Sequence, residues 1–444
     1  MSRQTQGEVG MNKQNKRRHF LEMAGTTGMA GILASHQAPA FAQGTNLHWL
    51  RWNDFVPACD QLFRQSIIPD AEKALGVKIR YETVNGNDLQ PRITSGIQSG
   101  AGPDLMMLFN NHPHLYRASL ADVSDVAEEI AKAQGSWYKV ASANCSSGGR
   151  FFSVPMALIG AMNAYRKSWF AEVGYSSFPK TWDQYRDAGK KLKAKGYPIG
   201  QSFGQSFGDP PTFAYPLLWS FGGAELDSRG AVVINSKETV EAVRWMTAAW
   251  KDAFDEGGLA WDDASNNRAF LAGTVCSTLN GASIYIESLR KPDAYKQANG
   301  APLKDDIAHA PLPAGPKGQF GFHTFTSHVI PSYSKNVKAT KDLVRFIMKA
   351  ENYGRWFETG QGFYTPGTPS WETHALWKKD PVMAPFAVAG QQGLTPGYPG
   401  EPNAKAAEVL TKYLIGNMFA SAIKGQKAEE AVAACDAQLK KIYV

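Results

Sequence analysis

A serine motif typical of hydrolases occurs twice in succession near the middle of the chain. Residues 199–211 read IGQSFGQSFGDPP, so that G-Q-S-F-G is present at 200–204 and again at 204–208. In the G-x-S-x-G pattern, a nucleophilic serine occupies a sharp turn between a strand and a helix. Here Ser202 falls within an expected strand, and Ser206 lies three residues before the expected start of a helix. We therefore predict no catalytic residue and interpret the stretch as a polar loop that holds a ligand.

The histidines and cysteines do not form a metal or redox motif. His112 and His114 are separated only by Pro113, and no carboxylate or cysteine joins them nearby, so we predict no metal site. No C-x-x-C motif is present, which excludes a zinc ribbon or thioredoxin chemistry. No cofactor is expected. Disulfide pairing and buried free thiols both remain open for the four cysteines, which are Cys59, Cys145, Cys276 and Cys435.

The first 42 residues have the features of a secretion signal. Lys16, Arg17 and Arg18 precede a weakly apolar stretch at 23–34, and Ala40-Phe41-Ala42 forms an A-x-A cleavage site. The arginine pair followed by Phe-Leu resembles a twin-arginine signal, with an ordinary Sec signal as the alternative. Either signal predicts a periplasmic protein. No later stretch reaches 18 consecutive apolar residues, so no membrane span is expected.

The net charge gives little reason to expect a nucleic-acid partner. The 444 residues carry a formal charge of +7, but residues 1–42 hold five basic and two acidic residues, which leaves +4 for the remainder. Basic clusters interleaved with aromatic residues are absent, so no nucleic-acid partner is predicted.

Strands and helices alternate along the chain, as in α/β proteins. Strands are expected at 47–52, 77–83 and 104–109, with helices at 58–75 and 88–99 between them, which predicts parallel layering. In the second block, Thr181 and Gln184 match a capping box, and Asp209 is expected to cap a helix that begins at Pro210. The helix after Thr181 is expected to run to 194, and the helix after Asp209 to 219. Further strands are expected at 199–203 and 275–279, and further helices at 239–254, 267–272, 339–349, 404–423 and 429–442.

The two α/β blocks are expected to form two lobes joined by three crossings, near 154–165, 327–333 and 385–402. Residues 43–155 and about 331–385 would form the first lobe. Residues from about 160 to 326 and from about 390 to 444 would form the second. A hinged cleft between two lobes follows from this arrangement.

Several stretches, in this order, resemble the extracellular sugar-binding proteins of ABC importers, the maltose-binding-protein-like class. They are SGAGPDLMMLFNNHPHLYRASLADVSD (99–125), SVPMALIGAMNAYRKSWF (153–170), GGAELDSRGAVVINSKETVEAVRWM (222–246), AFLAGTVCSTLNGASI (269–284) and GQKAEEAVAACDAQLKKI (425–442). The resemblance implies a two-lobed periplasmic-binding-protein fold and no enzymatic activity. It further implies a monomer that captures a mono- to oligosaccharide or polyol by lobe closure and delivers it to an inner-membrane ABC permease.

The resemblance also implies which loops contact the ligand. The first group of candidates follows the first and third strands and comprises Trp52, Asn53, Asp54, Asn110, Asn111 and His112. The second comprises Gln205, Asp209, Phe213, Ser283, His323, Phe325 and Tyr398, with Asn403 as a weaker candidate. Maltose-type members have an Asp-Arg pair where Asn111-His112 stand here and tryptophan where Leu108 and Ser283 stand, which argues against maltodextrin specificity.

Two alternatives remain open at this point. A receptor for a glycerol-phosphate-type solute would need an arginine or lysine anchor in the predicted loops, and none is evident. A carbohydrate-active hydrolase would need two carboxylates in one cleft, for which Asp54 and Asp209 are the candidates.

Overall fold

The computed structural model describes residues 44–444. The predicted secretion signal and its cleavage site lie outside the described residues. Apart from the first two residues of strand β1, every element below belongs to one unit, Leu47–Val444.

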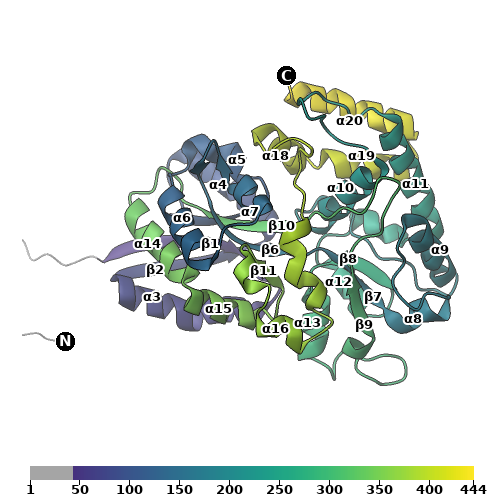
Figure 1. Cartoon of the computed structure of the whole chain (residues 1–444), viewed down its shortest axis with the longest axis horizontal. Coiled ribbons are helices and arrows are strands. Elements are labelled where there is room, and N and C mark those ends of the chain that lie inside the picture. The colour runs from purple at the N-terminus through teal and green to yellow at the C-terminus, as the bar shows by residue number, and fades with distance from the viewer. Residues whose placement is uncertain (1–43) are drawn as a thin grey trace, which may run out of the picture. The chain divides into compact units, whose positions relative to one another are not determined.

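A six-stranded mixed sheet forms the centre of the first lobe (Figure 1). Strands β1 and β3 run parallel, with Trp49 opposite Leu105, as the strand–helix–strand pattern predicts. Strand β10 pairs antiparallel with both β3 and β6, and β11 pairs antiparallel with β6. In spatial order the strands are β11 (Tyr364–Pro366), β6 (Val154–Ile159), β10 (Thr324–Val329), β3 (Leu105–Phe109), β1 (Thr45–Trp52) and β2 (Val77–Val84).

Helices cover this sheet on both sides in Figure 1. The predicted helix at 58–75 is present, but one π-helical turn at Phe63–Ile67 divides it, and it ends at Gly76 with a left-handed φ of 65°. The helices are α2 (Pro57–Leu62), α3 (Ile68–Leu75), α4 (Gly86–Ser99), α5 (Pro113–Tyr116), α6 (Ser124–Gln134), α7 (Lys139–Cys145), α14 (Val337–Met348) and α15 (Ala350–Thr359). The short elements nearby are β4 (Ser146–Ser147), β5 (Arg150–Phe151), α16 (Ala375–Lys379) and α17 (Ala389–Gln392).

A smaller antiparallel sheet of three strands forms the centre of the second lobe. Strand β7 (Met162–Arg166) lies between β8 (Ser277–Asn280) and β9 (Ile307–Ala310). The helices that follow in this part of the chain are α8 (Lys167–Glu172), α9 (Trp182–Lys193), α10 (Asp209–Phe221), α11 (Lys237–Ala253), α12 (Ser265–Leu271), α13 (Ser283–Arg290), α18 (Ala404–Thr411), α19 (Leu414–Ile423) and α20 (Ala428–Ile442).

Helix ends that depend on local sequence agree with the predictions, and those that depend on distant residues do not. The capping box of α9 is confirmed, because Thr181 accepts from the Gln184 backbone while the Gln184 side chain accepts from that of Thr181. Asp209 does not cap α10, because Gly208 holds the cap position and Asp209 is the first helical residue.

Two further element predictions are wrong. Residues 199–203 form no strand, since only Ile199 pairs, with Phe254 and Ser277, as isolated bridges. The single helix expected at 404–423 is two helices, because Tyr413 has a left-handed φ of 54° between them.

The chain passes between the sheets near one expected crossing and away from another. It leaves β6 at Ile159 and enters β7 at Met162, inside the predicted crossing at 154–165. It returns between Ala310 and Thr324, ahead of the crossing expected at 327–333, because Ser327–Val329 pair within the large sheet. The predicted lobe boundaries otherwise stay a prediction.

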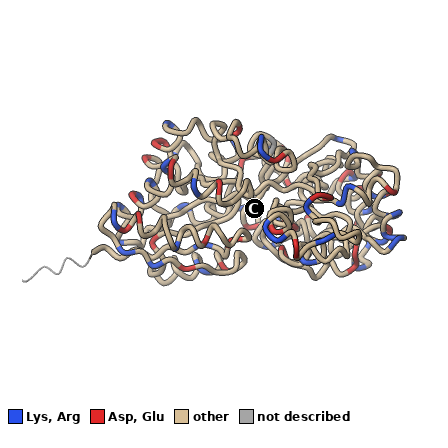
Figure 2. Tube along the Cα trace, turned by 90° about the horizontal axis from the view of Figure 1, so that it is seen from below, with Lys and Arg blue, Asp and Glu red and all other residues tan. Residues whose placement is uncertain are grey.

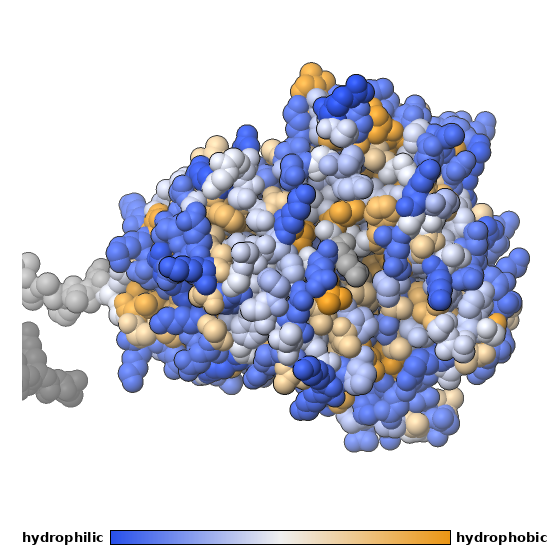
Figure 3. Space-filling view, in the orientation of Figure 1, coloured by the Kyte–Doolittle hydropathy of each residue, from blue (hydrophilic) through white to orange (hydrophobic). Residues whose placement is uncertain are grey.

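Two large clusters of buried apolar residues form the core. The first fills the first lobe and extends into the second through Phe270 and Ile284, and the second lies within the second lobe. Trp49, Phe109 and Trp356 are buried in the first lobe, and Trp182 and Phe213 in the second. Of the large apolar side chains in residues 44–444, only Val233 and Val444 are exposed. The face in Figure 3 is accordingly mostly hydrophilic with small apolar patches, and Figure 2 shows basic and acidic residues interspersed over both lobes. No helix within residues 44–444 is long and apolar enough to cross a membrane.

Glu225, which follows α10, supplies a test of the second lobe's core. The residue is 1% exposed and accepts from the Tyr443 hydroxyl at 3.2 Å. Burial raises its pKa from 4.5 to about 7. Between these values the folded protein binds more protons than the unfolded chain, so stability falls as pH rises through that window. Glu225→Gln is therefore expected to raise the free energy of unfolding by about 1–3 kcal/mol at about pH 8 and to change little at about pH 4.

Urea unfolding at both pH values checks this expectation. Glu430→Gln, at an exposed position on α20, is the matched control and should change little at either pH. Equal effects of Glu225→Gln at the two pH values would contradict the assignment of a buried charge.

Candidate functional site

The cavity beside Trp52 lies where the two lobes meet. It is small, about 30 Å³, and we call it the Trp52 chamber. The first lobe contributes Trp52, Phe55 and Phe363 to its wall. The second lobe contributes Phe207, Asp209, Asp263, Asn280 and Ser283. Aromatic rings therefore face carboxylate, amide and hydroxyl groups, and no lysine or arginine lines this chamber.

Asp263 organises the second-lobe side of the Trp52 chamber. Its carboxylate accepts from the backbone N–H groups of Gly208 at 3.1 Å and Asp209 at 2.7 Å, and from the Ser206 hydroxyl. These contacts satisfy the free N–H groups at the start of α10. The Asp209 carboxylate accepts from Asn266 Nδ2 at 2.6 Å. Burial and the proximity of the two carboxylates raise the pKa of Asp209, and burial raises that of Asp263.

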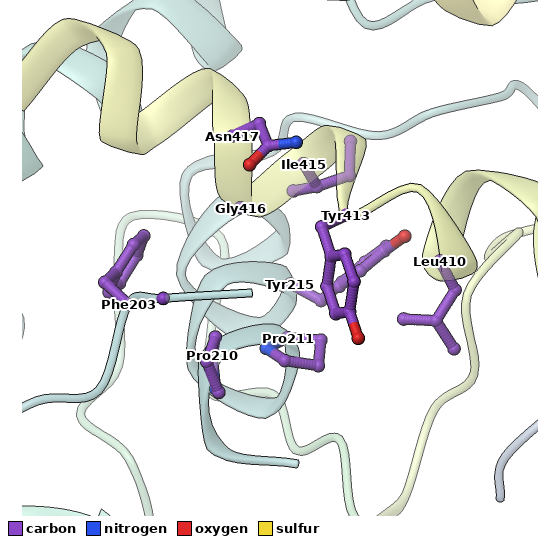
Figure 4. Close-up of a pocket in the computed structure, with 10 residues that line it drawn as sticks. Phe203, Pro210, Pro211, Tyr215, Leu410, Tyr413, Ile415, Gly416 and Asn417 are labelled. Carbon is purple, nitrogen blue, oxygen red and sulfur yellow. The ribbon is translucent and has the colours of Figure 1, made fainter. Parts of the chain in front are cut away.

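A second cavity between the lobes, the His112 chamber, has a volume of about 200 Å³. Its wall contains the imidazole of His112, the phenol of Tyr413 and the amides of Asn87 and Gln90, but no charged side chain. Tyr413 projects from the turn between α18 and α19 and lies beside Pro211 at the start of α10 (Figure 4). The rings of Phe109 and Phe207 complete the wall.

His112 is the buried polar group of this chamber. It is 7% exposed, and its Nδ1 has no hydrogen-bond partner among the described residues. Burial lowers the pKa of His112 to about 4, so its imidazole is neutral near pH 7. A neutral imidazole both donates and accepts a hydrogen bond, which suits a hydroxyl group of a ligand.

Two other cavities lie farther from these residues. Tyr398 lines one of about 350 Å³ together with Tyr138 and Gly393. His323 lies near Gly393 and accepts from the Ala161 backbone through Nδ1 at 3.0 Å, but it does not line that cavity. The other, about 730 Å³ between α13 and α16, contains none of the predicted site residues.

The loop after β1 directs one predicted residue into the Trp52 chamber and two away from it. Trp52 donates through Nε1 to the Tyr364 hydroxyl at 3.3 Å, and Tyr364 donates to Asp54 Oδ2 at 2.5 Å. Asp54 also accepts from the Val56 backbone, so it lies behind Trp52 and supports it. Asn53 is exposed and lines neither chamber.

Of the two amides that follow β3, that of Asn110 holds the backbone in place. Asn110 has a left-handed φ of 48°, and its Oδ1 accepts from the Phe325 backbone at 2.8 Å, which joins β3 to β10. Asn111 is fully buried, and neither side-chain polar atom has a partner among the described residues. Neither asparagine lines the two chambers.

Three further predicted residues stand outside both chambers. Phe213 packs in the second-lobe core against Trp182. Phe325 packs in the first lobe, in a small cluster that includes Leu158. Gln205 is exposed and donates to Asn417 Oδ1 at 3.4 Å. Asn403, the weaker candidate, caps α18 through its side chain.

The repeated serines hold the loop through hydrogen bonds. Ser202 donates to the backbone oxygen of Asp262 at 2.8 Å, and Ser206 donates to the Asp263 carboxylate. Within residues 44–444 neither serine is hydrogen-bonded to a histidine. The polar-loop interpretation therefore describes their contacts better than a nucleophile elbow does.

Sequence reasoning missed several residues of the two chambers. The clearest is Phe207, the aromatic residue of the second G-Q-S-F-G repeat, a motif whose known chemistry belongs to its serine. Asn280 belongs to the N-G segment from which only Ser283 was selected. Phe109, Phe363 and Tyr413 carried no local signal, because only the packing of the lobes places them here.

The four cysteines are all buried free thiols, which answers the open question on disulfides. Within residues 44–444 no group of three or more histidine, cysteine or acidic side chains is arranged to hold a metal ion.

Comparison with known proteins identifies relatives of the same architecture. A "Probable ABC transporter-binding protein" from Deinococcus radiodurans is 26% identical over 231 residues, which cover 50% of this chain and 53% of that protein. This chain thus matches about half the length of that curated relative. Maltose-bound MalE3 of T. maritima has a TM-score of 0.75 at 20% identity, covering 90% of this chain and 100% of that chain.

A second solved structure, an ABC transporter solute-binding protein from Thermotoga lettingae bound with α-D-tagatose, has a TM-score of 0.73. It is 18% identical and covers 90% of this chain and 100% of that chain. At these identities the structural likeness establishes the fold, which is the predicted two-lobed α/β arrangement.

The family described as "Bacterial extracellular solute-binding protein" matches residues 60–354, which is more than half of the chain. The predicted relationship is confirmed, and the chain belongs to the bacterial extracellular solute-binding protein family.

Proposed function

We propose that this protein binds a neutral sugar or polyol between its two lobes and delivers it to the permease of an ABC importer. The observation that carries the proposal is the composition of the two chambers. Their walls combine aromatic rings with amide, hydroxyl, imidazole and carboxylate groups, and no lysine or arginine is among them. Aromatic faces pack against the apolar faces of sugar rings, while the polar groups bond to hydroxyls.

The chemistry of the relatives supports this class of solute. Two solved structures of the same fold contain maltose and α-D-tagatose, and the Deinococcus radiodurans relative is described as an ABC transporter-binding protein. An anionic glycerol-phosphate-type solute fits less well, because a phosphate needs convergent arginine or lysine donors. Neither chamber has one in its wall, and the Trp52 chamber has two carboxylates instead.

The proposed role is binding without chemistry. Of the pair expected for two-carboxylate hydrolysis, Asp209 lines the Trp52 chamber but Asp54 is bonded behind Trp52. The other carboxylate in that wall, Asp263, is bonded to the N–H groups at the start of α10. We further propose that residues 1–42 are a twin-arginine signal, that the exported protein works in the periplasm, and that it acts as a monomer.

Thermal unfolding of the purified protein against a panel of sugars, pentitols and glycerol phosphates tests the proposal. A solute that binds only the folded state is expected to stabilise it by about 2.7 kcal/mol at a hundredfold excess over its dissociation constant. Recovery of that solute unchanged would support a receptor. Consumption of the solute would instead indicate an enzyme, and a shift produced only by glycerol phosphates would contradict the neutral class.

A further inference from the structure

Phe207 belongs to the second lobe, but its ring lies among residues of the first. The ring stacks on Phe109, with centroids 4.1 Å apart and planes 15° from parallel. It meets Trp52 edge to face, at 5.8 Å and 84°. The residue is 9% exposed, so most of the ring is covered by these contacts.

The first lobe provides a fitted seat for this ring. A Cβ atom on Gly86 would lie 2.3 Å from Phe207 Cε1, so any side chain at position 86 would displace the ring. The backbone of Gly86 is not left-handed, so the glycine is needed for space and not for conformational freedom. Next to it, Asn87 Oδ1 accepts from the Phe207 backbone N–H at 3.2 Å.

The seated ring is a wall of both chambers. On one side lies the Trp52 chamber of about 30 Å³, with Asp209 and Asp263 in its wall. On the other side lies the His112 chamber of about 200 Å³, with His112 and Tyr413 in its wall. The two spaces thus differ in size and in charge, and Phe207 is common to both.

The volumes determine what each chamber can hold. The Trp52 chamber has room for about one water molecule, whose share of liquid volume is about 30 Å³. The His112 chamber is partly open to solvent, and its volume is comparable with that of a closed apolar cavity of about 150 Å³ that is known to hold benzene. Its covered part therefore has room for about one six-membered ring.

From this geometry we infer that Phe207 is a specificity-determining residue that limits the solute to about one sugar ring or a polyol of that size. When the lobes are together, the ring separates the His112 chamber from the Trp52 chamber, and a second sugar unit cannot extend from one to the other. This inference rests on the proposed function, whose solute class it narrows.

The seat of the ring can be tested without any solute. Cysteines introduced at the exposed positions Glu128 on α6 and Glu241 on α11 report the distance between the lobes after labelling, because the four native cysteines are buried. Gly86→Ala and Phe207→Ala are each expected to lower the ratio of closed to open protein by about 3- to 10-fold, as loss of an aromatic stack would. The double variant should be no more open than Phe207→Ala alone.

Gly416→Ala is the matched control for a glycine replacement. A Cβ atom there would meet nothing within 4 Å, so the ratio of closed to open protein should not change. Additive effects of Gly86→Ala and Phe207→Ala, or no effect of Gly86→Ala, would show that the Phe207 ring does not occupy the space beside Gly86. Either result would overturn the inference.

The size limit is tested by calorimetric titration with matched pairs: glucose and maltose, xylose and xylobiose, and ribitol as a polyol. In the unaltered protein we expect the one-ring member or the polyol to bind at least tenfold more tightly than the two-ring member. Phe207→Ala, which merges the chambers, is expected to reduce that preference at least tenfold, while Phe207→Tyr should retain it.

The outcomes separate the inference from the proposed function. Tighter binding of a disaccharide by the unaltered protein, or a preference unchanged in Phe207→Ala, would overturn the size limit and leave the proposed function intact. If no sugar or polyol bound, the proposed function and the size limit that rests on it would both be overturned, whereas the double-variant result would still decide whether Phe207 occupies its seat.

Discussion

His112→Leu is expected to weaken solute binding by about 10- to 100-fold while leaving the ligand-free protein at least as stable as before. His112 is only 7% exposed, and its Nδ1 has no hydrogen-bond partner among the described residues. A buried polar group without a partner costs about 1–3 kcal/mol, which a leucine of similar size avoids. The same group is available to a ligand hydroxyl, and losing such a bond reduces affinity by the stated factor.

Calorimetric titration with the solute found by thermal unfolding measures the loss, and urea unfolding measures the stability. Because the pKa of His112 is lowered to about 4, the imidazole stays neutral as pH falls to about 5. The factor by which His112→Leu weakens binding should therefore be the same at about pH 5 and about pH 8, and it should shrink only as the pH approaches about 4.

His114→Leu is the matched control, two residues away. His114 also has a buried Nδ1 without a partner among the described residues. It differs from His112 because its Nε2 is bonded to the backbone oxygen of Ala143 at 2.9 Å, its ring packs against Phe152, and it lines neither chamber. This replacement should lower stability by about 1–3 kcal/mol and leave affinity unchanged. An equal loss of affinity in both variants would show that His112 has no direct part in binding.

Arg51→Ala is expected to destabilise the protein by about 3–5 kcal/mol, the largest effect on stability that we predict. The guanidinium is fully buried, 4.5 Å from the centroid of the Phe63 ring, and it donates to the Tyr81 hydroxyl at 3.2 Å. Two carboxylates lie near it, Asp54 at 3.9 Å and Asp60 at 4.0 Å. Removing the cation leaves the fully buried Asp54 side chain, and the partly buried Asp60, without this neighbouring positive charge.

The free energy of unfolding in urea, with its dependence on urea concentration, measures this effect. Arg64→Ala is the matched control, because Arg64 is exposed although it also contacts Tyr81 and Thr83. Its loss should cost no more than about 1 kcal/mol. If the two alanine variants were equally stable, the buried cation of Arg51 would not stabilise the first lobe more than an exposed arginine does.

Features that depend on neighbours within a few residues were predictable from the sequence. The capping box at Thr181 and Gln184 and the end of α3 at Gly76 are examples, because caps involve hydrogen bonds over three or four positions. The parallel pairing of β1 and β3 also followed, since alternating strands and helices have few ways to pack. The order of the quoted stretches was sufficient to recognise the family.

The site depended on contacts between residues far apart in the chain. Asp263, 54 residues from Asp209, takes the N-terminal hydrogen bonds of α10, so the cap expected at Asp209 is absent. Phe213 was expected in the cleft, but the rotation of α10 turns it into the core against Trp182.

The sequence by itself determined the α/β class and the family. Of the ligand-binding residues it predicted, Trp52, Asp209 and Ser283 line one chamber and His112 lines the other. Only the tertiary structure decided that Phe207 lies on Phe109 in the space that Gly86 leaves open. The physical reason is that side-chain periodicity reports which face of an element is buried but not which distant element covers it. Which residues line the chambers follows from how the two lobes pack together.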